Sequence, residues 1–494
     1  MPLILPGNVA SALGGAYEVA NSVRFDGSNA KLTKSQSGTS TNDKKGTFSW
    51  WFKRSNISST QYFINMESGQ ERFQWYILTS GAFSGNYRAS NGSPDSDLAL
   101  TGAPKFLDPS AWYHFCLAWD TTDGTQLNRL RFYVNNTEYV VTQSQTIAQN
   151  TVFPMMKSSF GSDLNIFTQG SQNYCNGYAA EVVFIDGQQL TPSSFGEYDE
   201  DSPTIWKPKD VSGLTFGTIG YYLDFEDSSA LGNDVSGNNN DFTETNLVAT
   251  DQSTDTCTNN FCTLNPLTLQ DSDFVLSEGN LKISIGGNNE RKAVLGTFGL
   301  TAGKWYWEVK YISTSGQAFS QIGISDVIQG AEASSENGKM GYFAYDYGYR
   351  GEKSSGSGGF KTNNGNYSNY GDAWTTGDII GVAVDLDNNA IYFSKNGSFQ
   401  ESGAVGDPTS GASRTNATFN ITAASSTGTG AYFPAIGKED SDDPVFEFNF
   451  GGTNSASFTI SSGNADANGY GNFEYAPPSG YLSLCTKNLG SSGG

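Results

Sequence analysis

The sequence predicts an all-β protein made of two antiparallel β-sandwiches joined by an irregular segment. Apolar and polar residues alternate with period 2 along much of the 494-residue chain, and helical periodicity is nearly absent. The 58 glycines stand among Asn, Asp, Ser and Thr, which are the residues of turns between short strands. A chain of this length exceeds what one hydrophobic core can organise, so we expect more than one domain.

We expect the first sandwich over residues 21–202. Its clearest strands place alternate apolar side chains on one face and leave the other face toward solvent. These core-facing sets are Phe48, Trp50 and Phe52, then Tyr113, Phe115, Leu117 and Trp119, then Leu130, Phe132 and Val134. Residues 1–20 precede this sandwich as a short apolar arm. This arm is either an anchor that docks on a neighbouring subunit, or a frayed terminus or simple first strand.

Residues 203–267 are rich in Pro, Gly, Asn and Asp, so we expect a connecting segment with short strands such as Tyr221 to Phe225. The second sandwich is expected over 268–494 and ends in a Gly/Ser-rich tail. Its strands include one with Trp305, Trp307, Val309 and Tyr311 on the same face. Val382 to Leu386 and Ile391 to Phe393 flank an Asp-Asn-Asn turn, which predicts a hairpin.

Composition excludes several classes of function. The formal charge of −22 repels phosphate backbones and anionic bilayers, so nucleic-acid binding is not expected. No apolar run approaches the roughly 20 residues of a membrane span, so membrane insertion is not expected either. The N-terminal residues lack the features of a signal peptide. Five cysteines are too few for a disulfide framework, and whether Cys257 and Cys262 pair stays open. The single histidine argues against a zinc site or a histidine-based triad.

Five motifs near the C-terminus occur in the order typical of one family of β-sandwich domains. They are Gly303 to Val309, Gln321 to Ser325, Gly377 to Gly397, Tyr432 to Ala435 and Asn449 to Gly451. On these residues the stretch 303–451 resembles the SPRY family. The resemblance implies an antiparallel sandwich that binds partners through loops at one edge and does not catalyse a reaction.

The first stretch is similar to another group of sandwiches. Phe25-Asp26-Gly27, Trp112-Tyr113-His114-Phe115, Phe132-Tyr133-Val134-Asn135 and Asp186-Gly187 match its strand motifs. On these motifs residues 21–200 resemble the laminin-G-like, concanavalin-A-like lectin and glucanase sandwiches. Asn136 departs from the pattern, where a glycine usually follows.

The order of the two domains, the Met1 to Gly14 leader and the tail from Pro477 to Thr486 together resemble virion proteins of marine tailed bacteriophages. Such proteins are usually called fibre or tail proteins. The resemblance implies assembly in the host cytoplasm, localisation on the virion and other virion subunits as partners. It also implies a homo-oligomer, although no coiled-coil heptads indicate one here.

A tyrosine-rich stretch before the predicted hairpin supplies the candidate ligand-binding residues. Tyrosine amid Gly, Ser and Asn is typical of adaptable binding loops, and tyrosine rings can stack on sugars. The alternative is that several of these tyrosines are ordinary strand residues. The candidates are Tyr342, Tyr345, Tyr347, Tyr349, Tyr367 and Tyr370.

Calcium is the one cofactor that the sequence admits, because its coordination suits Asp and Asn oxygens. The candidate ligands are Asp224, Asp227, Asp234 and Asp241. The alternative is turn chemistry, in which Asp and Asn side chains bond to nearby backbone N–H groups.

Catalytic signals are weak. Concanavalin-A-like glycanases place carboxylates two residues apart on a strand, and the nearest match is Glu197 to Asp201, in a loop-like stretch. His114 lies on the same side of its predicted strand as Trp112 and Cys116, which favours a packed, hydrogen-bonded histidine.

We therefore expect a non-enzymatic virion protein, a tail-fibre or head-fibre component that recognises a host surface glycan or protein. Two alternatives remain at this point. One is a structural protein that decorates the capsid or tail, and the other is a glycan-cleaving enzyme of concanavalin-A-like fold.

Overall fold

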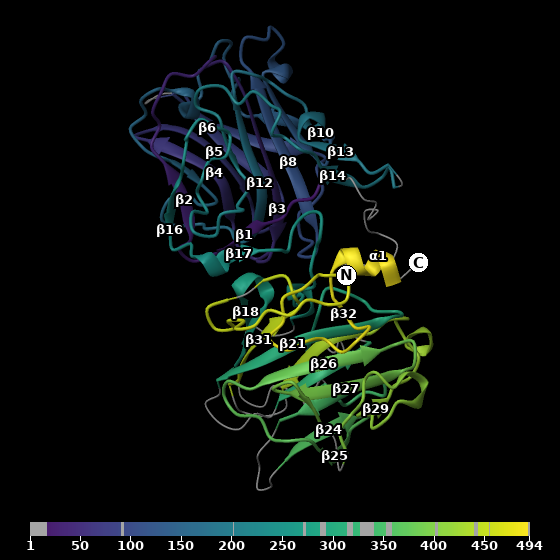
Figure 1. Cartoon of the computed structure of the whole chain (residues 1–494). Helices are drawn as coiled ribbons and strands as arrows, with labels where there is room; N and C mark the ends of the chain where they lie inside the picture. Colours follow the sequence, from purple (N-terminus) through teal and green to yellow (C-terminus); the bar gives the residue numbers. More distant parts are fainter. Residues whose placement is uncertain are drawn as a thin grey trace. The chain divides into compact units, whose positions relative to one another are not determined.

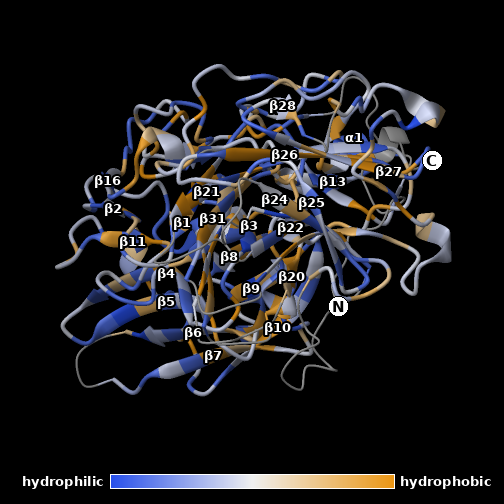
Figure 2. Ribbon diagram, turned by 90° about the horizontal axis from the view of Figure 1, so that it is seen from below, coloured by the Kyte–Doolittle hydropathy of each residue, from blue (hydrophilic) through white to orange (hydrophobic). Residues whose placement is uncertain are grey.

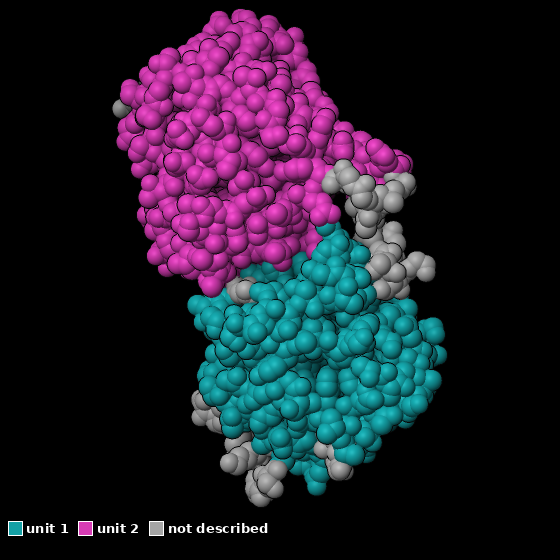
Figure 3. Space-filling model, in the orientation of Figure 1, with its two compact units in different colours: residues 1–9, 260–494 teal, residues 10–259 magenta. Residues whose placement is uncertain are grey.

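The computed structural model describes residues 17–89, 93–200, 202–269, 273–286, 293–313, 320–326, 340–351, 358–400, 404–438, 443–453 and 455–492. The described chain divides between Asn259 and Asn260 into two compact units (Figure 3), with unit 2 before this point and unit 1 after it. Both units consist of β-sheet (Figure 1), which confirms the predicted fold class. Among the described residues the one α-helix is α1 (Thr486–Ser492), and no helix there has the length and apolar character needed to cross a membrane.

Unit 2 is a sandwich whose strands follow one hydrogen-bonded path. In spatial order the described strands are β16 (Thr243–Thr245), β2 (Lys31–Lys34), β11 (Leu164–Ile166), β4 (Gln61–Ser68), β5 (Glu71–Ile77), β6 (Phe83–Arg88), β7 (Ser96–Thr101), β10 (Thr137–Gln143), β9 (Leu130–Val134), β8 (Trp112–Asp120), β3 (Lys45–Arg54), β12 (Asn176–Asp186), β1 (Ser22–Asp26) and β17 (Gln252–Ser253). β15 (Tyr221–Leu223) pairs with β12 beside this path. The first half of β10 pairs with β9 and the second half with β7, so β10 passes from one layer to the other.

The core of unit 2 lies between these two layers and is unusually aromatic. Trp50 packs against Phe63 across the layers with ring centroids 5.5 Å apart, and Phe83 packs against Phe132 at 4.5 Å. All of these side chains are buried. The three expected strands form β3, β8 and β9, and their predicted apolar faces are the core faces. Alternation therefore identified the inner side of this sandwich correctly.

The opposite face of β3 differs from the expectation that it meets solvent. Ser49, Trp51 and Lys53 are all buried. The side chains that cover Trp51 include Val19 and Trp206, and Trp206 belongs to a small two-stranded ribbon of β13 (Gly196–Tyr198) and β14 (Trp206–Pro208). A second hydrophobic layer thus lies on the outside of the sheet.

Unit 2 also extends past the boundary expected at residue 202. β15, β16 and β17 come from the predicted connecting segment, yet they hydrogen-bond to β12, β2 and β1. Two buried ion pairs attach the end of this segment to the sheet: Arg24 lies 2.8 Å from Asp251 and Lys53 lies 2.7 Å from Asp255. Residues 203–259 are therefore part of the first sandwich, and only 260–267 belong with the second.

Unit 1 contains two further sheets. Among the described residues the larger one runs β18 (Phe274–Ser277), β19 (Lys282–Ile285), β31 (Val445–Asn449), β21 (Lys304–Ser313), β26 (Ile379–Asp385), β27 (Ala390–Lys395) and β28 (Ser398–Phe399), with β29 (Phe419–Asn420) on β27 and β32 (Leu482–Ser483) parallel to β21. The smaller one runs β20 (Ala293–Leu295), β30 (Phe433–Lys438), β22 (Ser320–Ser325), β23 (Tyr347–Arg350), β24 (Gly359–Asn363) and β25 (Asn366–Tyr370).

The core of unit 1 confirms the strands expected from alternation. β26 and β27 form the predicted hairpin, with Asp385 opposite Ala390. Trp305 and Trp307 of β21 lie in the same buried cluster as Ile322 of β22, which joins the two sheets. Figure 2 shows the hydrophobic colouring that runs along β26.

The C-terminal tail is tied to unit 1 by a buried carboxylate. Asp466 accepts hydrogen bonds from the backbone of Ser483 at 2.8 Å and from the side-chain amide of Asn488 at 2.7 Å. Leu484 and Leu489 are buried in the core cluster of this unit. The segment expected as a Gly/Ser-rich tail thus contributes β32 and α1 to the fold.

Short 3₁₀ turns complete the described chain. They are Gln126–Asn128, Pro154–Met156, Pro192–Ser194, Ala249–Asp251, Pro266–Thr268, Glu278–Asn280, Gly411–Ser413 and Ala424–Ser426.

Candidate functional site

The structure separates the six candidate tyrosines into a buried group and an exposed group. Tyr347, Tyr349 and Tyr370 are 5%, 0% and 3% exposed and lie in the core of unit 1. Tyr345 is half-buried and packs against the same core. Tyr342 and Tyr367 keep 36% and 37% of their surface exposed.

This separation corrects the prediction, and strand register is the physical reason. In β23, Tyr347 and Tyr349 stand two residues apart, so they point to the same side, opposite Ile324 and Ile322 of β22. Tyr349 packs edge-on to Trp374, with ring centroids 5.0 Å apart. These tyrosines therefore hold the sandwich together and are not available to a ligand.

The two exposed tyrosines lie near the hairpin turn between β24 and β25. The turn residues Asn364 and Gly365 donate backbone hydrogen bonds to the carbonyl groups of Phe343 (3.1 Å) and Gly341 (2.9 Å). Tyr342 therefore lies against this turn, and Tyr367 follows it on β25. We call the exposed set Tyr342, Asn364, Gly365, Asn366 and Tyr367 the tyrosine surface.

The tyrosine surface carries no ionisable side chain other than the tyrosines. One cation, Arg350, stands beside it, whereas Lys361 lies on the side of β24 that faces Tyr370. The guanidinium of Arg350 lies 5.5 Å from the ring centre of Tyr367. Lys361 donates to the carbonyl of Thr418 at 2.9 Å, and its ammonium lies 5.3 Å from the ring of Phe419. Burial lowers the pKa of Lys361. The surface thus offers aromatic faces and amide groups, which can stack on a ligand and hydrogen-bond to it.

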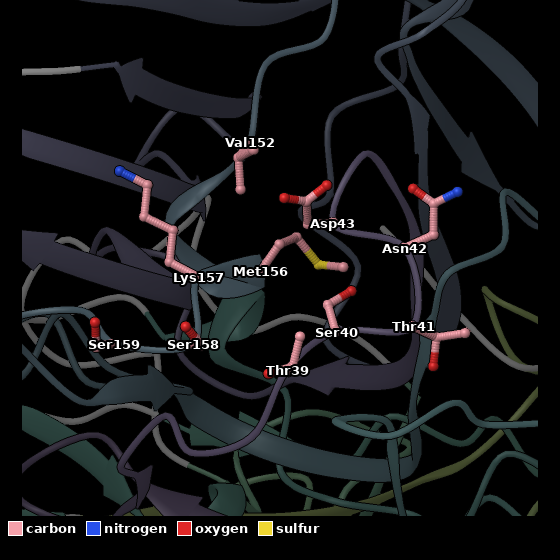
Figure 4. Close-up of a pocket in the computed structure, with 10 residues that line it drawn as sticks. All are labelled: Thr39, Ser40, Thr41, Asn42, Asp43, Val152, Met156, Lys157, Ser158 and Ser159. Carbon is pink, nitrogen blue, oxygen red and sulfur yellow. The ribbon is translucent and has the colours of Figure 1, made fainter.

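A cleft of about 620 Å³ opens in unit 2 (Figure 4) and was not predicted from the sequence. It is lined by Thr39, Ser40, Thr41, Asn42, Asp43, Val152, Met156, Lys157, Ser158 and Ser159. Two segments more than a hundred residues apart in sequence form it, so no local motif marks it. The carboxylate of Asp186 holds one of these segments through the backbone N–H of Thr41 at 2.8 Å.

Both charged groups of this cleft already have partners. Lys157 lies 2.5 Å from Glu71, and Figure 4 shows its ammonium group turned away from Met156. Asp43 lies 2.9 Å from Lys44. What remains is a lining of hydroxyl groups and one amide around Met156, which suits a neutral, hydroxylated ligand better than an ion.

The four candidate calcium ligands take part in turns instead. Asp227 accepts from Ser229, and Asp224 accepts from the backbone of Glu226. Asp241 accepts from the backbone of Asp234 at 2.9 Å. Nowhere in the described residues do three or more acidic, histidine or cysteine side chains form a group that could hold a metal.

Asp234 is the structural centre of this loop. Its carboxylate accepts from the backbone N–H groups of Tyr222 (2.8 Å), Ser236 (2.9 Å) and Asn240 (2.8 Å), and also from the Ser236 hydroxyl. A carboxylate with this many donors orders the loop without an ion. The turn chemistry named as the alternative is therefore what the structure contains.

His114 is fully buried and locked in one tautomer. Trp206 Nε1–H donates to His114 Nδ1 at 3.0 Å, and because indole is a donor only, that nitrogen carries no proton. The proton is therefore on Nε2, which donates to Ser49 Oγ at 2.8 Å. Burial lowers the pKa of His114 to about 3. This histidine cannot accept a proton from the serine, so the pair is structural.

The candidate glycanase carboxylates lie on the β13–β14 ribbon and not on a core strand. Lys207 lies 3.8 Å from Glu197 and 3.6 Å from Asp199. Asp199 is 2% exposed and also accepts from the backbone of Ser202. An exposed and a buried carboxylate that share one lysine do not form an open catalytic cleft.

Two buried glutamates were missed by sequence reasoning. Burial raises the pKa of Glu308 to about 7, and its carboxyl group accepts backbone hydrogen bonds from Glu474 and Tyr475. Burial raises the pKa of Glu181 to about 8, and its carboxyl group contacts the hydroxyls of Tyr17 and Tyr222. Glu308 has one near partner, the hydroxyl of Tyr306 at 3.2 Å, but the other tyrosine and backbone partners of the two glutamates stand 41 to 167 residues away, so a local pattern shows little of either site.

Comparison with known proteins agrees with the two domain resemblances, to the SPRY family and to the concanavalin-A-like sandwiches. Residues 304–453 match the family model of the SPRY domain, and residues 26–193 match that of the concanavalin A-like lectin/glucanases superfamily. Ran-binding protein 9 of Danio rerio is 33% identical over 128 residues, which cover 25% of this chain and 20% of that protein. The ATP-dependent RNA helicase DDX1 of Xenopus laevis is 32% identical over 101 residues, or 20% of this chain and 12% of that protein. The chain thus spans a fifth or less of these relatives.

Solved structures similar to this chain include two β-sandwich proteins. The SPRY domain of human HERC1 aligns with 37% of this chain and 96% of that chain, at 16% identity and a TM-score of 0.26. The heptameric SAP-like pentraxin of Limulus polyphemus aligns with 36% of this chain and 80% of that chain, at 15% identity and a TM-score of 0.25. From its family matches, the chain carries a concanavalin A-like domain followed by a SPRY domain.

Proposed function

We propose that this chain is a non-enzymatic recognition protein of a tailed-phage virion, and that it binds a glycan or protein of the host surface. The observation that carries the proposal is the tyrosine surface of unit 1. Tyr342 and Tyr367 keep more than a third of their area exposed, beside an uncharged Asn-Gly turn. Aromatic faces with neighbouring amides can bind a ligand by stacking and hydrogen bonding, and they supply no catalytic group.

We propose that the chain is not an enzyme because its candidate catalytic side chains are engaged in structural hydrogen bonds and ion pairs. His114 has its proton on the nitrogen that faces Ser49, and Glu197 and Asp199 both pair with Lys207. The virion assignment rests on the resemblance of the domain order, leader and tail to phage fibre proteins. In such an assembly many copies act together, so weak binding at each tyrosine surface becomes strong adhesion.

The test is binding of the full chain to whole bacterial cells and to an array of bacterial surface polysaccharides. A double variant, Tyr342→Ala with Tyr367→Ala, should weaken binding by about tenfold or more, the loss expected when contacts worth 1–2 kcal/mol are removed. Tyr198→Ala is the matched control, because that tyrosine is 45% exposed but lies on unit 2. It should leave binding unchanged.

Other outcomes would favour the alternatives. Failure to bind any cell or polysaccharide, together with a regular lattice of the chain on the particle, would make it a decoration protein. Release of reducing sugar that is lost in Glu197→Gln would make it an enzyme.

A further inference from the structure

Glu181 interrupts the alternation of β12, and a β-bulge is the cause. Ala179 and Val182 point into the core of unit 2, whereas Ala180 and Val183 point to the outer face. The pairing of β12 with β3 shifts between Ala180 and Val183. Glu181 is the extra residue at this position and has a positive φ of 51°. Bulges re-aim side chains in this way, and such backbone strain is concentrated at functional positions.

The bulge turns Glu181 out of the aromatic core and onto two tyrosines of the outer face. Its Oε2 lies 3.1 Å from the hydroxyl of Tyr17 and 3.0 Å from that of Tyr222. The two hydroxyls lie 3.0 Å from each other. Glu181 itself is 5% exposed. Three oxygen-bearing groups thus form a closed triangle with water largely excluded.

Counting protons shows that this triangle needs a neutral carboxyl group. A protonated Glu181 and two tyrosine hydroxyls supply three O–H donors, one for each side of the triangle. An ionised Glu181 leaves two donors for three contacts, so one pair of oxygens faces each other without a proton. A buried carboxylate is also costly without a cation. The shift of its pKa to about 8 agrees with this geometry.

Among the described residues, the charged groups that act on Glu181 are acidic. Asp224 and Glu226 follow β15 and raise the pKa of Glu181, while Asp210 raises that of Tyr17. Cys257 faces Glu181 from the segment that follows β17. The hydrogen bonds from Tyr222 and Tyr17 favour the ionised carboxylate, but burial outweighs them and the pKa of Glu181 is raised.

Tyr17 belongs to a segment that the triangle holds on the sheet. Two residues later, Val19 is 5% exposed and packs on Trp51 and Ala180. Its backbone N–H donates to Thr258 Oγ1 at 3.1 Å. Thr258 Oγ1 also lies 3.3 Å from the carbonyl oxygen of Val19, and the Tyr17 ring packs against the same cluster, so the Tyr17 hydroxyl is the attachment of this segment that involves Glu181.

We propose that Glu181, Tyr222 and Tyr17 form a proton-dependent latch, which holds the segment 17–20 on unit 2 when Glu181 is protonated and loosens it when Glu181 ionises. The sign follows from linkage. The docked state binds one more proton than the undocked state between the ordinary pKa of a glutamate and the raised one, so docking weakens as the pH rises. With a single proton involved, the docking equilibrium changes by at most tenfold per pH unit.

The test is hydrogen exchange of the full chain, followed by mass spectrometry of peptides that cover residues 17–23, between pH 5 and 9.5. Wild type is compared with Glu181→Gln at each pH, because the ratio of the two exchange rates cancels the intrinsic effect of pH. Glutamine stays neutral and keeps a donor. The ratio should rise by up to about tenfold per pH unit from about pH 5 up to about pH 8, where the docked carboxyl group also ionises, and it should level off above that pH.

Two further variants distinguish the latch from other effects of pH and from the loss of any one carboxylate. Tyr17→Phe removes the latch hydroxyl alone, and its exchange rate relative to Glu181→Gln should show no such rise. Glu138→Gln is the matched control, since this exposed carboxylate lies away from Glu181 in a surface pair with Arg131 at 3.6 Å, and it should behave as wild type. A ratio that stays flat across the whole pH range, or a rise of equal size in Tyr17→Phe, would overturn the latch.

Discussion

Replacing Lys53 with methionine should strongly destabilise unit 2. Lys53 and Asp255 are 1% and 2% exposed at their side chains and 2.7 Å apart, so the substitution leaves a buried carboxylate without its cation. Trp112 Nε1 still donates to Asp255 at 3.2 Å, but a neutral donor does not balance the charge. Removal of one partner of a buried pair typically costs about 3–5 kcal/mol. For a domain of this size that corresponds to a fall in Tm of roughly 6–20 °C.

The assay is differential scanning calorimetry of the full chain, with two matched variants. Lys44→Met breaks a pair whose side chains are 24% and 49% exposed, so it should lower the transition of unit 2 by less than about 4 °C. Lys53→Met combined with Asp255→Leu removes both charges and should recover most of the loss. Lys53→Met could instead shift the transition no more than Lys44→Met does. The Lys53–Asp255 pair would then not anchor residues 252–259, and it would not stabilise the extension of unit 2 to Asn259.

Three other predictions concern residues of both units. Tyr349→Ala should destabilise unit 1 by about 3–5 kcal/mol in chemical denaturation because it leaves a cavity, whereas Tyr367→Ala should cost less than about 1 kcal/mol. Asp234→Ala should cost unit 2 about 2–5 kcal/mol because buried N–H groups lose their acceptor, while a calcium chelator should leave the Tm of wild type unchanged; a chelator-dependent Tm would contradict the turn assignment. Glu308→Gln should lower the Tm of unit 1, since an amide cannot accept from all the donors that converge there, and an unchanged Tm would refute this role.

Much of the fold could be predicted from the sequence because a sheet repeats a local pattern. The inner face of β3 is indicated by the alternating Phe48, Trp50 and Phe52. The Asp-Asn-Asn turn predicts the hairpin of β26 and β27. Both signals lie within a few residues of the element that they define. The same holds for the family motifs, which are themselves strands and turns.

The candidate site was predicted only in part, although a signal for the rest was present. Tyr345, Tyr347 and Tyr349 stand two residues apart, which is the spacing of one face of a strand, and this face is the core. Tyr367 and Tyr370 stand three residues apart and so point to opposite sides, one outward and one inward. Applying the period-2 rule to the tyrosines themselves would have separated the exposed group from the buried one.

The extent of unit 2 could not be predicted in this way, because the contacts that set it are not local. Arg24 meets Asp251 across 227 residues, and Lys53 meets Asp255 across 202. Alternation places Lys53 on the outer side of β3, but it does not tell whether that side is covered. A charged residue at an outward position is usually read as solvent-exposed. Here it marks the place where a distant segment returns to the sheet, and the same is true of Glu181 at its bulge. In a sandwich of this kind, the outward charged residues of the central strands are therefore the first places to look for the true boundary of the domain.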